Sequence, residues 1–213
     1  MRYTCLLSIV CVLISGSLAQ DPKNSTGTKT NSATTLDQGE IENGSYRNVS
    51  FGFSYKLPYG WVDRTTEMRE ASTDPSKSSV FLATFERPPE STGSTVNSSI
   101  VFAAESASSY PGLKSAAQYF GPLTELTAAR GFEAVNEPYE FPVDGRPIVR
   151  RDFIKQRGSV GMHQSTLALL SKGYVVSFTF IGGSDEEVQQ LIEWLKFGNI
   201  RGSAKHSPAA SAP

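Results

Sequence analysis

The sequence predicts an α+β fold in which an antiparallel β-sheet is flanked by helices. Segments with strand patterning fall into two groups, one before residue 105 and one after residue 131, with a helical stretch between them. Consecutive strands of the second group are joined by tight turns that contain glycine, which suits antiparallel neighbours. A second helix follows the last strand. This order favours an antiparallel sheet over a doubly wound parallel fold.

The first 19 residues have the pattern of a secretory signal peptide. Arg2 gives a positive start, the run from Cys5 to Ile14 is apolar but too short to span a bilayer, and small residues occupy Ser17 and Ala19. We predict cleavage between Ala19 and Gln20, which would leave a secreted or periplasmic protein with no stable membrane anchor. A retained N-terminal anchor is the alternative.

The composition limits what the mature chain can do. Both cysteines lie in the signal segment, so the mature protein has no disulfide, thiol nucleophile or thiolate metal site. A net charge of −1 provides no field for nucleic acid. Residues 20–44 are expected to form a flexible polar leader and residues 201–213 a disordered tail. One domain, from residue 45 to 200, remains, and it must be held together by its hydrophobic core.

The domain is expected to begin with a strand between Tyr46 and Trp61. Apolar side chains alternate along it, which is the pattern of a strand with one face in a core. The side chains on this face are Phe51, Phe53, Tyr55 and Leu57. Pro58 and Gly60 then end the strand.

Two more strands and a helix are expected next. The strands cover Ser79 to Arg87 and Thr95 to Ala104, with polar loops at 65–77 and 88–94. Apolar residues at helical spacing follow, namely Leu113, Ala116, Ala117 and Phe120. Gly121-Pro122 should interrupt or kink this helix, and we expect it to end at Gly131 if it continues beyond the proline.

The C-terminal part is expected to contain further strands and a capped helix. The strand segments are 132–141, 147–156, 160–170 and 174–181, with turns at Asp144-Gly145, Arg157-Gly158-Ser159 and Lys172-Gly173. Ser184 and Glu187 form a capping box, and Gly198 ends the helix. The apolar stripe of that helix is Val188, Leu191, Ile192 and Leu195.

Two of these segments resemble a known family. Tyr46-x-Asn48 followed by FGFSYKLPYGW is similar to the start of PsbP-like domains, and GYVVSFTFIGGSDEEVQQLIEWLKFGNI is similar to their last strand and final helix. The resemblance covers about residues 46–200. It implies an α/β/α sandwich around an antiparallel sheet, shared with the Ran-binding Mog proteins, whose members act as assembly factors, accessory subunits or partner-binding modules. The leader is secretory, so a photosystem role is not carried over.

His163 is the candidate for catalysis. It lies in a predicted strand in phase with Ser165, whereas the second histidine, His206, lies in the tail. A general base or a metal ligand is one interpretation, and a structural or surface histidine is the one we favour. The chain has neither a G-x-S-x-G nor a His-Glu-x-x-His motif. We therefore expect no metal site and no cofactor.

Two groups of residues are candidates for binding. A basic cluster surrounds one strand and consists of Arg146, Arg150, Arg151, Lys155 and Arg157. It indicates either a surface for anions or acidic partners, or an edge strand protected by charge, which we favour. Arg150 should point opposite to Arg151. Tyr59 and Trp61 are candidates for a pocket or partner site, although packing over the edge of the core is the favoured interpretation for Trp61.

The predicted function is a secreted or periplasmic, non-catalytic binding or accessory module. We expect a monomer with a protein partner in the cell envelope. The alternative is a small-molecule hydrolase or other enzyme that uses His163.

Overall fold

A computed structural model of the chain describes residues 36–72, 79–88, 96–158 and 160–198. The predicted signal peptide, most of the predicted leader and the predicted tail lie outside these residues. The α+β fold class is confirmed, because the described chain forms two antiparallel sheets accompanied by helices. None of the helices in these ranges is long and apolar enough to cross a membrane.

The larger sheet has eight strands in the order β4-β5-β6-β11-β10-β9-β7, and β8 also pairs with β9. Its strands are β4 (Val62–Asp63), β5 (Ser79–Glu86), β6 (Ser99–Ser106), β7 (Glu133–Ala134), β8 (Tyr139–Val143), β9 (Arg146–Arg157), β10 (Val160–Ser171) and β11 (Tyr174–Gly182). The smaller sheet has the order β1-β2-β3-β12, with β1 (Glu40–Glu42), β2 (Ser45–Asn48), β3 (Phe53–Lys56) and β12 (Leu195–Phe197). The helices are α1 (Thr65–Ala71), α2 (Ala116–Ala128) and α3 (Asp185–Glu193), with a 3-10 turn η1 (Ala107–Ser109).

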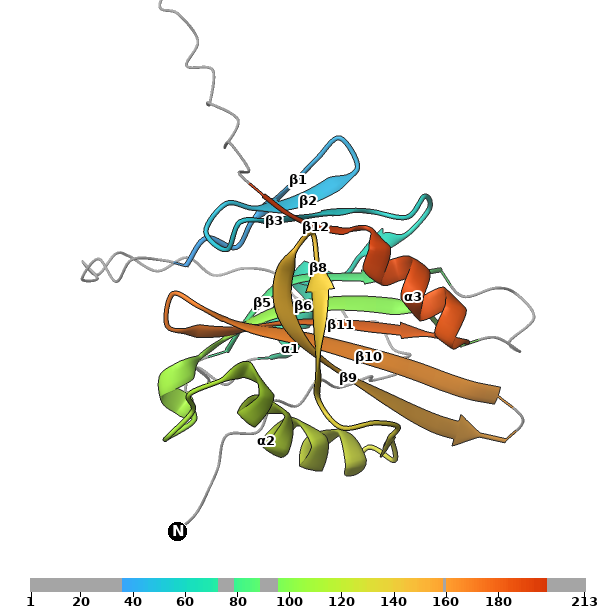
Figure 1. The fold of residues 1–213 in the computed structure, drawn as a ribbon. Coiled ribbons are helices and arrows are strands. Elements are labelled where there is room, and N and C mark those ends of the chain that lie inside the picture. Colours follow the sequence, from blue (N-terminus) through green and yellow to red (C-terminus); the bar gives the residue numbers. More distant parts are fainter. Residues whose placement is uncertain (1–35, 73–78, 89–95, 159, 199–213) are drawn as a thin grey trace, which may run out of the picture.

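The large sheet is covered on both faces (Figure 1). The small sheet and α3 lie on one face, and α2 lies on the other. The central strand β11 shows this in its sequence, because Phe178 and Phe180 are buried under the small sheet while Val175 is buried against α2. A strand that is covered on both faces carries apolar side chains on both.

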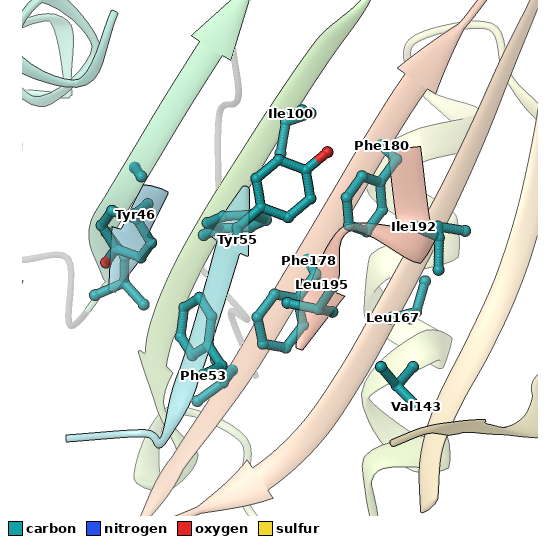
Figure 2. Close-up of a cluster of buried hydrophobic side chains, with 14 of the residues drawn as sticks. Tyr46, Phe53, Tyr55, Ile100, Val143, Leu167, Phe178, Phe180, Ile192 and Leu195 are labelled. Atoms are coloured by element: carbon teal, nitrogen blue, oxygen red, sulfur yellow. The ribbon is translucent and has the colours of Figure 1, made fainter. Parts of the chain in front are cut away.

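The main core joins the two sheets through aromatic side chains (Figure 2). Phe53 and Tyr55 of the small sheet point toward Phe102, Phe178 and Phe180 of the large sheet. The rings of Phe53 and Phe178 meet edge to face with centroids 4.8 Å apart, a favoured geometry for aromatic pairs. The predicted buried face of the opening segment is therefore correct for Phe51, Phe53 and Tyr55, each at most 3% exposed.

The opening segment is a hairpin rather than one strand. Its two arms, β2 and β3, pair antiparallel. The turn between them forms because the Asn48 side chain accepts a hydrogen bond from the Phe51 N–H at 2.9 Å, and Gly52 adopts a positive φ of 69°. Asparagine and glycine are the residues that such a turn needs.

The described domain also starts before the expected boundary at residue 45. The strand β1 lies inside the range assigned to the leader and pairs with β2 through a two-residue turn at Asn43-Gly44. Both turn residues have positive φ, 51° and 70°, as a type I′ hairpin requires. Asp37 is also engaged, since its carboxylate accepts from the Ser50 N–H at 3.2 Å.

The strand expected at 132–141 is two strands, β7 and β8, and the three helices also differ from expectation. The helix α1 occupies part of the predicted loop at 65–77. The helix α2 runs through Pro122 without interruption; Pro122 and Gln118 are both exposed, so solvent can take the carbonyl that proline leaves free. The last helix ends at Glu193, and Leu195 belongs to β12 because its segment pairs with β3.

Candidate functional site

His163 lies near the start of β10 (Val160–Ser171) and contacts Asp185, the first residue of α3. Its Nδ1 atom is 2.7 Å from the Asp185 carboxylate, and the Asp185 side chain is 84% exposed. Ser165, the next residue on that face, donates its hydroxyl hydrogen to Asp152. Within the described residues, His163 is therefore paired with an acid but not with a nucleophile, and it lines neither of the two cavities described below.

Arg150 is held inside a polar network between β9, β10 and α3. Its guanidinium donates to Asp152 at 2.7 Å, and to Gln189 at 2.9 Å and Ser165 at 3.0 Å. The cation also lies 4.9 Å from the centre of the Phe141 ring. With its side chain only 12% exposed, Arg150 positions local groups and presents little charge to solvent.

Arg151 points to the other face of the sheet, toward α2. It donates to the Asn136 carbonyl at 2.9 Å and to the Thr124 hydroxyl at 2.8 Å. The two arginines therefore point in opposite directions, as expected. The interpretation of a charged edge strand is wrong, because β9 pairs with β10 on one side and with β7 and β8 on the other.

Asp152 is the acceptor at the centre of the Arg150 network. Burial raises the pKa of its carboxyl, but hydrogen bonds from Ser165, Arg150 and Asn136 outweigh burial and hold the pKa below its ordinary value. Asn136 donates at 2.7 Å, and the Tyr139 hydroxyl donates at 3.1 Å. The network ties β8 and the segment before it to β9 and β10.

Tyr59 and Trp61 follow β3 but have different environments. Tyr59 is fully exposed, whereas Trp61 is partly buried and packs against the main core. The favoured interpretation of Trp61 agrees with this packing. Neither residue lines a cavity described here.

The larger cavity is a groove of about 420 Å³ at the place where β8, α3 and β12 meet. Its lining residues are Phe141, Pro142, Val143, Asp144, Gln189, Ile192, Glu193, Leu195 and Lys196. Val143, Ile192 and Leu195 are buried and form an aliphatic floor, while Glu193 and Lys196 are exposed at the rim. We refer to this site as the β8–β12 groove.

The turn between β8 and β9 fixes one end of the β8–β12 groove. Asp144 and Gly145 have positive φ values of 48° and 74°, as in a type I′ turn. The Asp144 carboxylate accepts from the Phe197 N–H at 2.8 Å and lies 3.7 Å from the Lys196 ammonium. The Asp-Gly turn was predictable, but the groove was not, because its walls come from segments about fifty residues apart in sequence.

The smaller cavity, of about 290 Å³, is polar and lies between β1, α1 and β5. Arg69 is its main charged donor. Its guanidinium already donates to the carbonyls of Phe81 at 2.8 Å and Leu82 at 2.7 Å, where β5 has an irregular register. This arginine therefore supports the strand. The described residues contain no cluster of three or more His, Cys, Asp or Glu side chains that could hold a metal ion.

No protein-family model and no curated protein matches the sequence. Similar solved structures include cyanobacterial PsbP from Synechocystis sp. PCC 6803, which is 14% identical with a TM-score of 0.47 and a match over 80% of this chain and 98% of that one. The Ran-binding protein Mog1p of Saccharomyces cerevisiae is 11% identical, with a TM-score of 0.42 over 75% of this chain and 87% of its own. LpqN of Mycobacterium tuberculosis, involved in cell envelope biogenesis, is 11% identical, with a TM-score of 0.38 over 66% and 76%.

Both protein groups named from the sequence resemblance thus recur among the solved structures similar to this chain, which confirms the resemblance to that extent. At these identities and scores, the comparisons assign no ligand, partner or activity. The function must therefore be argued from the chain's own geometry.

Proposed function

We propose that this protein is a non-catalytic binding or accessory module, secreted or periplasmic, that contacts a partner protein through the β8–β12 groove. The observation that carries the proposal is the groove itself, an open site with a buried aliphatic floor and a charged rim. Its volume of about 420 Å³ is within the range of binding sites. The candidate catalytic histidine lies outside it.

The polar residues elsewhere support a binding role over a catalytic one. Arg150, Asp152 and Ser165 satisfy one another in the network between β9, β10 and α3. Groups that are fully engaged in this way stabilise the fold and are not available to a substrate. A partner would instead meet the rim and floor of the β8–β12 groove.

Export of the protein is part of the proposal and rests on the pattern of the first 19 residues. N-terminal analysis of the protein recovered from the extracellular or periplasmic fraction tests it. We expect the mature chain to start at Gln20. Recovery of the chain only in the cytoplasm, with Met1 or Arg2 at its start, would contradict export.

Site-specific photo-crosslinking tests the partner-binding role. A photoreactive amino acid at Lys196, on the rim of the β8–β12 groove, is compared with the same group at Glu140. Glu140 is exposed on β8 but does not line the groove. We expect an adduct with one defined envelope protein from position 196 and none from position 140. Absence of adducts, or equal labelling at both positions, would count against this function.

The enzyme alternative has one observation in its favour, the 2.7 Å contact between His163 and Asp185. A carboxylate at this distance could orient the imidazole as a general base. The variant His163→Ala, assayed on a panel of ester and phosphoester substrates beside the parent chain, decides the matter. Loss of a measurable activity would support an enzyme, and unchanged activities would remove this alternative.

A further inference from the structure

We propose that the β8–β12 groove binds a lysine or arginine side chain presented by an extended segment of the partner protein. This inference rests on the proposed function, which assigns the groove to partner binding. It follows from the backbone groups that the two strands turn toward the groove, from the charge on the rim and from the aliphatic floor.

The wall formed by β12 presents more backbone carbonyl acceptors than free N–H donors on the side away from β3. The Trp194 carbonyl accepts from the Lys56 N–H at 3.3 Å, and the Gly198 N–H donates to the Gly52 carbonyl at 3.3 Å. Because backbone groups alternate in direction along a strand, those of Leu195 and Phe197 point away from β3. The Phe197 N–H is already occupied by Asp144. Acceptors therefore predominate along this wall.

The wall formed by β8 has the same character. Pro142 lies opposite Pro147 in the β8–β9 pair, and two prolines can face each other only where no ladder hydrogen bond is made. The Pro142 carbonyl consequently points away from β9, and this position has no N–H to offer. Addition of a partner strand needs donors and acceptors in alternation, so both edges are poorly suited to it.

Glu193 supplies an unpaired negative charge at the rim. It is the last residue of α3 and is exposed. A carboxylate is unfavourable at the C-terminal end of a helix, where the dipole is negative. Among the described residues, no cation forms an ion pair with Glu193, whereas the other rim carboxylate, Asp144, is paired with Lys196. A cationic ligand would offset a charge that the fold itself does not need.

A basic side chain matches all of these features together. Lysine and arginine have an apolar stem and a head that only donates hydrogen bonds. The stem would lie on Val143, Ile192 and Leu195, and the head would meet the Glu193 carboxylate and the free carbonyls of the walls. A carboxylate or phosphate ligand would instead be repelled by the unpaired Glu193 carboxylate, since the Lys196 ammonium on the same rim is already paired with Asp144.

Short peptides test this inference directly. The probe is a nine-residue peptide of alanine, serine and glycine with one central arginine, compared with otherwise identical peptides that carry lysine, glutamine or glutamate. Binding to the chain from residue 20 onward is followed by amide chemical-shift changes, which detect weak complexes and locate them. We expect saturable shifts at residues of the β8–β12 groove with arginine and lysine, and none with glutamine or glutamate.

Two matched variants define the role of charge. Glu193→Lys should weaken the affinity for the arginine peptide about tenfold, because it replaces attraction with repulsion. Glu140→Lys should leave this affinity unchanged. Glu193→Lys should also raise Tm, since a cation is favourable at that helix end, so lost binding would not reflect misfolding. The inference would be overturned if the glutamine peptide bound as tightly as the arginine peptide, or if the Glu193→Lys variant bound the arginine peptide as tightly as the parent chain does.

The two proposals fail in different ways. If a partner crosslinks at position 196 and the arginine peptide neither shifts groove residues nor competes with it, the basic-side-chain inference is wrong and the proposed function stands. If no partner crosslinks at position 196 and the peptides leave the groove unperturbed, both are wrong.

Discussion

The carboxylate of Asp144 accepts a hydrogen bond from the backbone N–H of Phe197 at 2.8 Å. This bond joins the tip of the β8–β9 hairpin to the last strand of the small sheet. It occupies an N–H that would otherwise be free beside the β8–β12 groove, and it fixes one end of that groove. One side chain thus links the two sheets at the edge of the core.

Asp144→Ala is expected to destabilise the fold by about 2 kcal/mol. The change leaves the Phe197 N–H without its acceptor, which costs roughly 1–3 kcal/mol for a buried group and less for one that water can reach. It also places alanine at a φ of 48°, a conformation that asparagine and aspartate tolerate better. Urea unfolding followed by circular dichroism measures the difference.

Asp144→Asn is the matched control for that prediction. It keeps an oxygen acceptor and suits the positive φ, so its free energy of unfolding should stay within about 1 kcal/mol of the parent. A large loss in the asparagine variant, or none in the alanine variant, would show that the contact contributes little.

Removal of residues 1–44 should destabilise the domain, whereas removal of residues 1–35 should not. The longer deletion removes β1 and three further contacts to the hairpin: the bond from the Tyr46 hydroxyl to the Gln38 carbonyl, at 2.8 Å, and the Asp37 contacts with Asn48 and Ser50. These contacts cover Tyr46 and Asn48, which are at most 2% exposed. We expect a drop in Tm of several degrees or more, as follows from a loss of 1 kcal/mol or above.

Equal Tm values for the two deletions would mean that the segment from Leu36 to Gly44 adds nothing to the domain. Both proteins should be measured by calorimetry under the same buffer and concentration.

Local patterns predicted much of this fold because local chemistry determines those parts. Tight turns formed at Asp144-Gly145 and Lys172-Gly173, as predicted. All four residues adopt positive φ, as in type I′ hairpin turns. The α3 N-cap also formed as predicted, since the Glu187 N–H donates to the Ser184 hydroxyl at 3.2 Å. The Glu187 side chain differs in one detail and accepts from the Gly183 N–H.

The errors arose where local patterns are ambiguous or where distant segments decide. Asn43-Gly44 was a hairpin signal that the polar composition of residues 20–44 concealed. Leu195 has the same apolar character in a helical stripe and in a short strand, and pairing with Tyr55 decided for the strand. The β8–β12 groove depends on the meeting of two edges that lie far apart in sequence, so no single motif could reveal it.

Arg150→Met is expected to cost about 2 kcal/mol of stability at neutral pH. Methionine keeps contact with Phe141 but removes the hydrogen bonds to Asp152, Gln189 and Ser165, and bonds to charged groups contribute about 1.5–3 kcal/mol. The pKa of the Asp152 carboxyl is lower in the folded chain than in the unfolded chain. Ionised Asp152 therefore stabilises the fold above its ordinary pKa of 3.8, and this stabilisation is lost as the pH falls through the lower pKa of the folded state. The difference in free energy of unfolding between variant and parent should therefore narrow in strongly acidic solution, although the bonds to Gln189 and Ser165 remain lost in the variant.

Arg146→Met provides the comparison for that measurement. Arg146 lies over the Phe197 ring, 5.0 Å from its centre, and lies outside the Asp152 network. Its loss should cost less than about 1 kcal/mol at any pH. If both arginine variants show the same cost, the buried network is not the source of the effect.

Glu105 is a buried acid beneath α2 and should make the docking of this helix sensitive to pH. It lies on β6, is only 3% exposed, and accepts hydrogen bonds from the hydroxyls of Tyr110 and Tyr119, the latter at 2.6 Å. Burial raises the pKa of its carboxyl above the ordinary 4.5, although the tyrosine hydrogen bonds oppose this. The folded chain therefore favours the protonated form more strongly than the unfolded chain does.

Glu105→Gln is expected to remove this pH dependence. Because the pKa of Glu105 is higher in the folded state, protonation of this carboxyl stabilises the fold. The stabilisation is complete below pH 4.5, the ordinary pKa, and is lost as the pH rises through the pKa of the folded state. As the pH rises from 4 to neutral, the free energy of unfolding of the glutamine variant should increase relative to that of the parent, by about 1.4 kcal/mol for each unit by which the fold raises the pKa of Glu105. Urea unfolding from pH 4 to pH 8 measures the difference between the two free energies, which cancels the titration of other groups. Parallel curves over this range would show that Glu105 ionises in the fold as readily as in the unfolded chain.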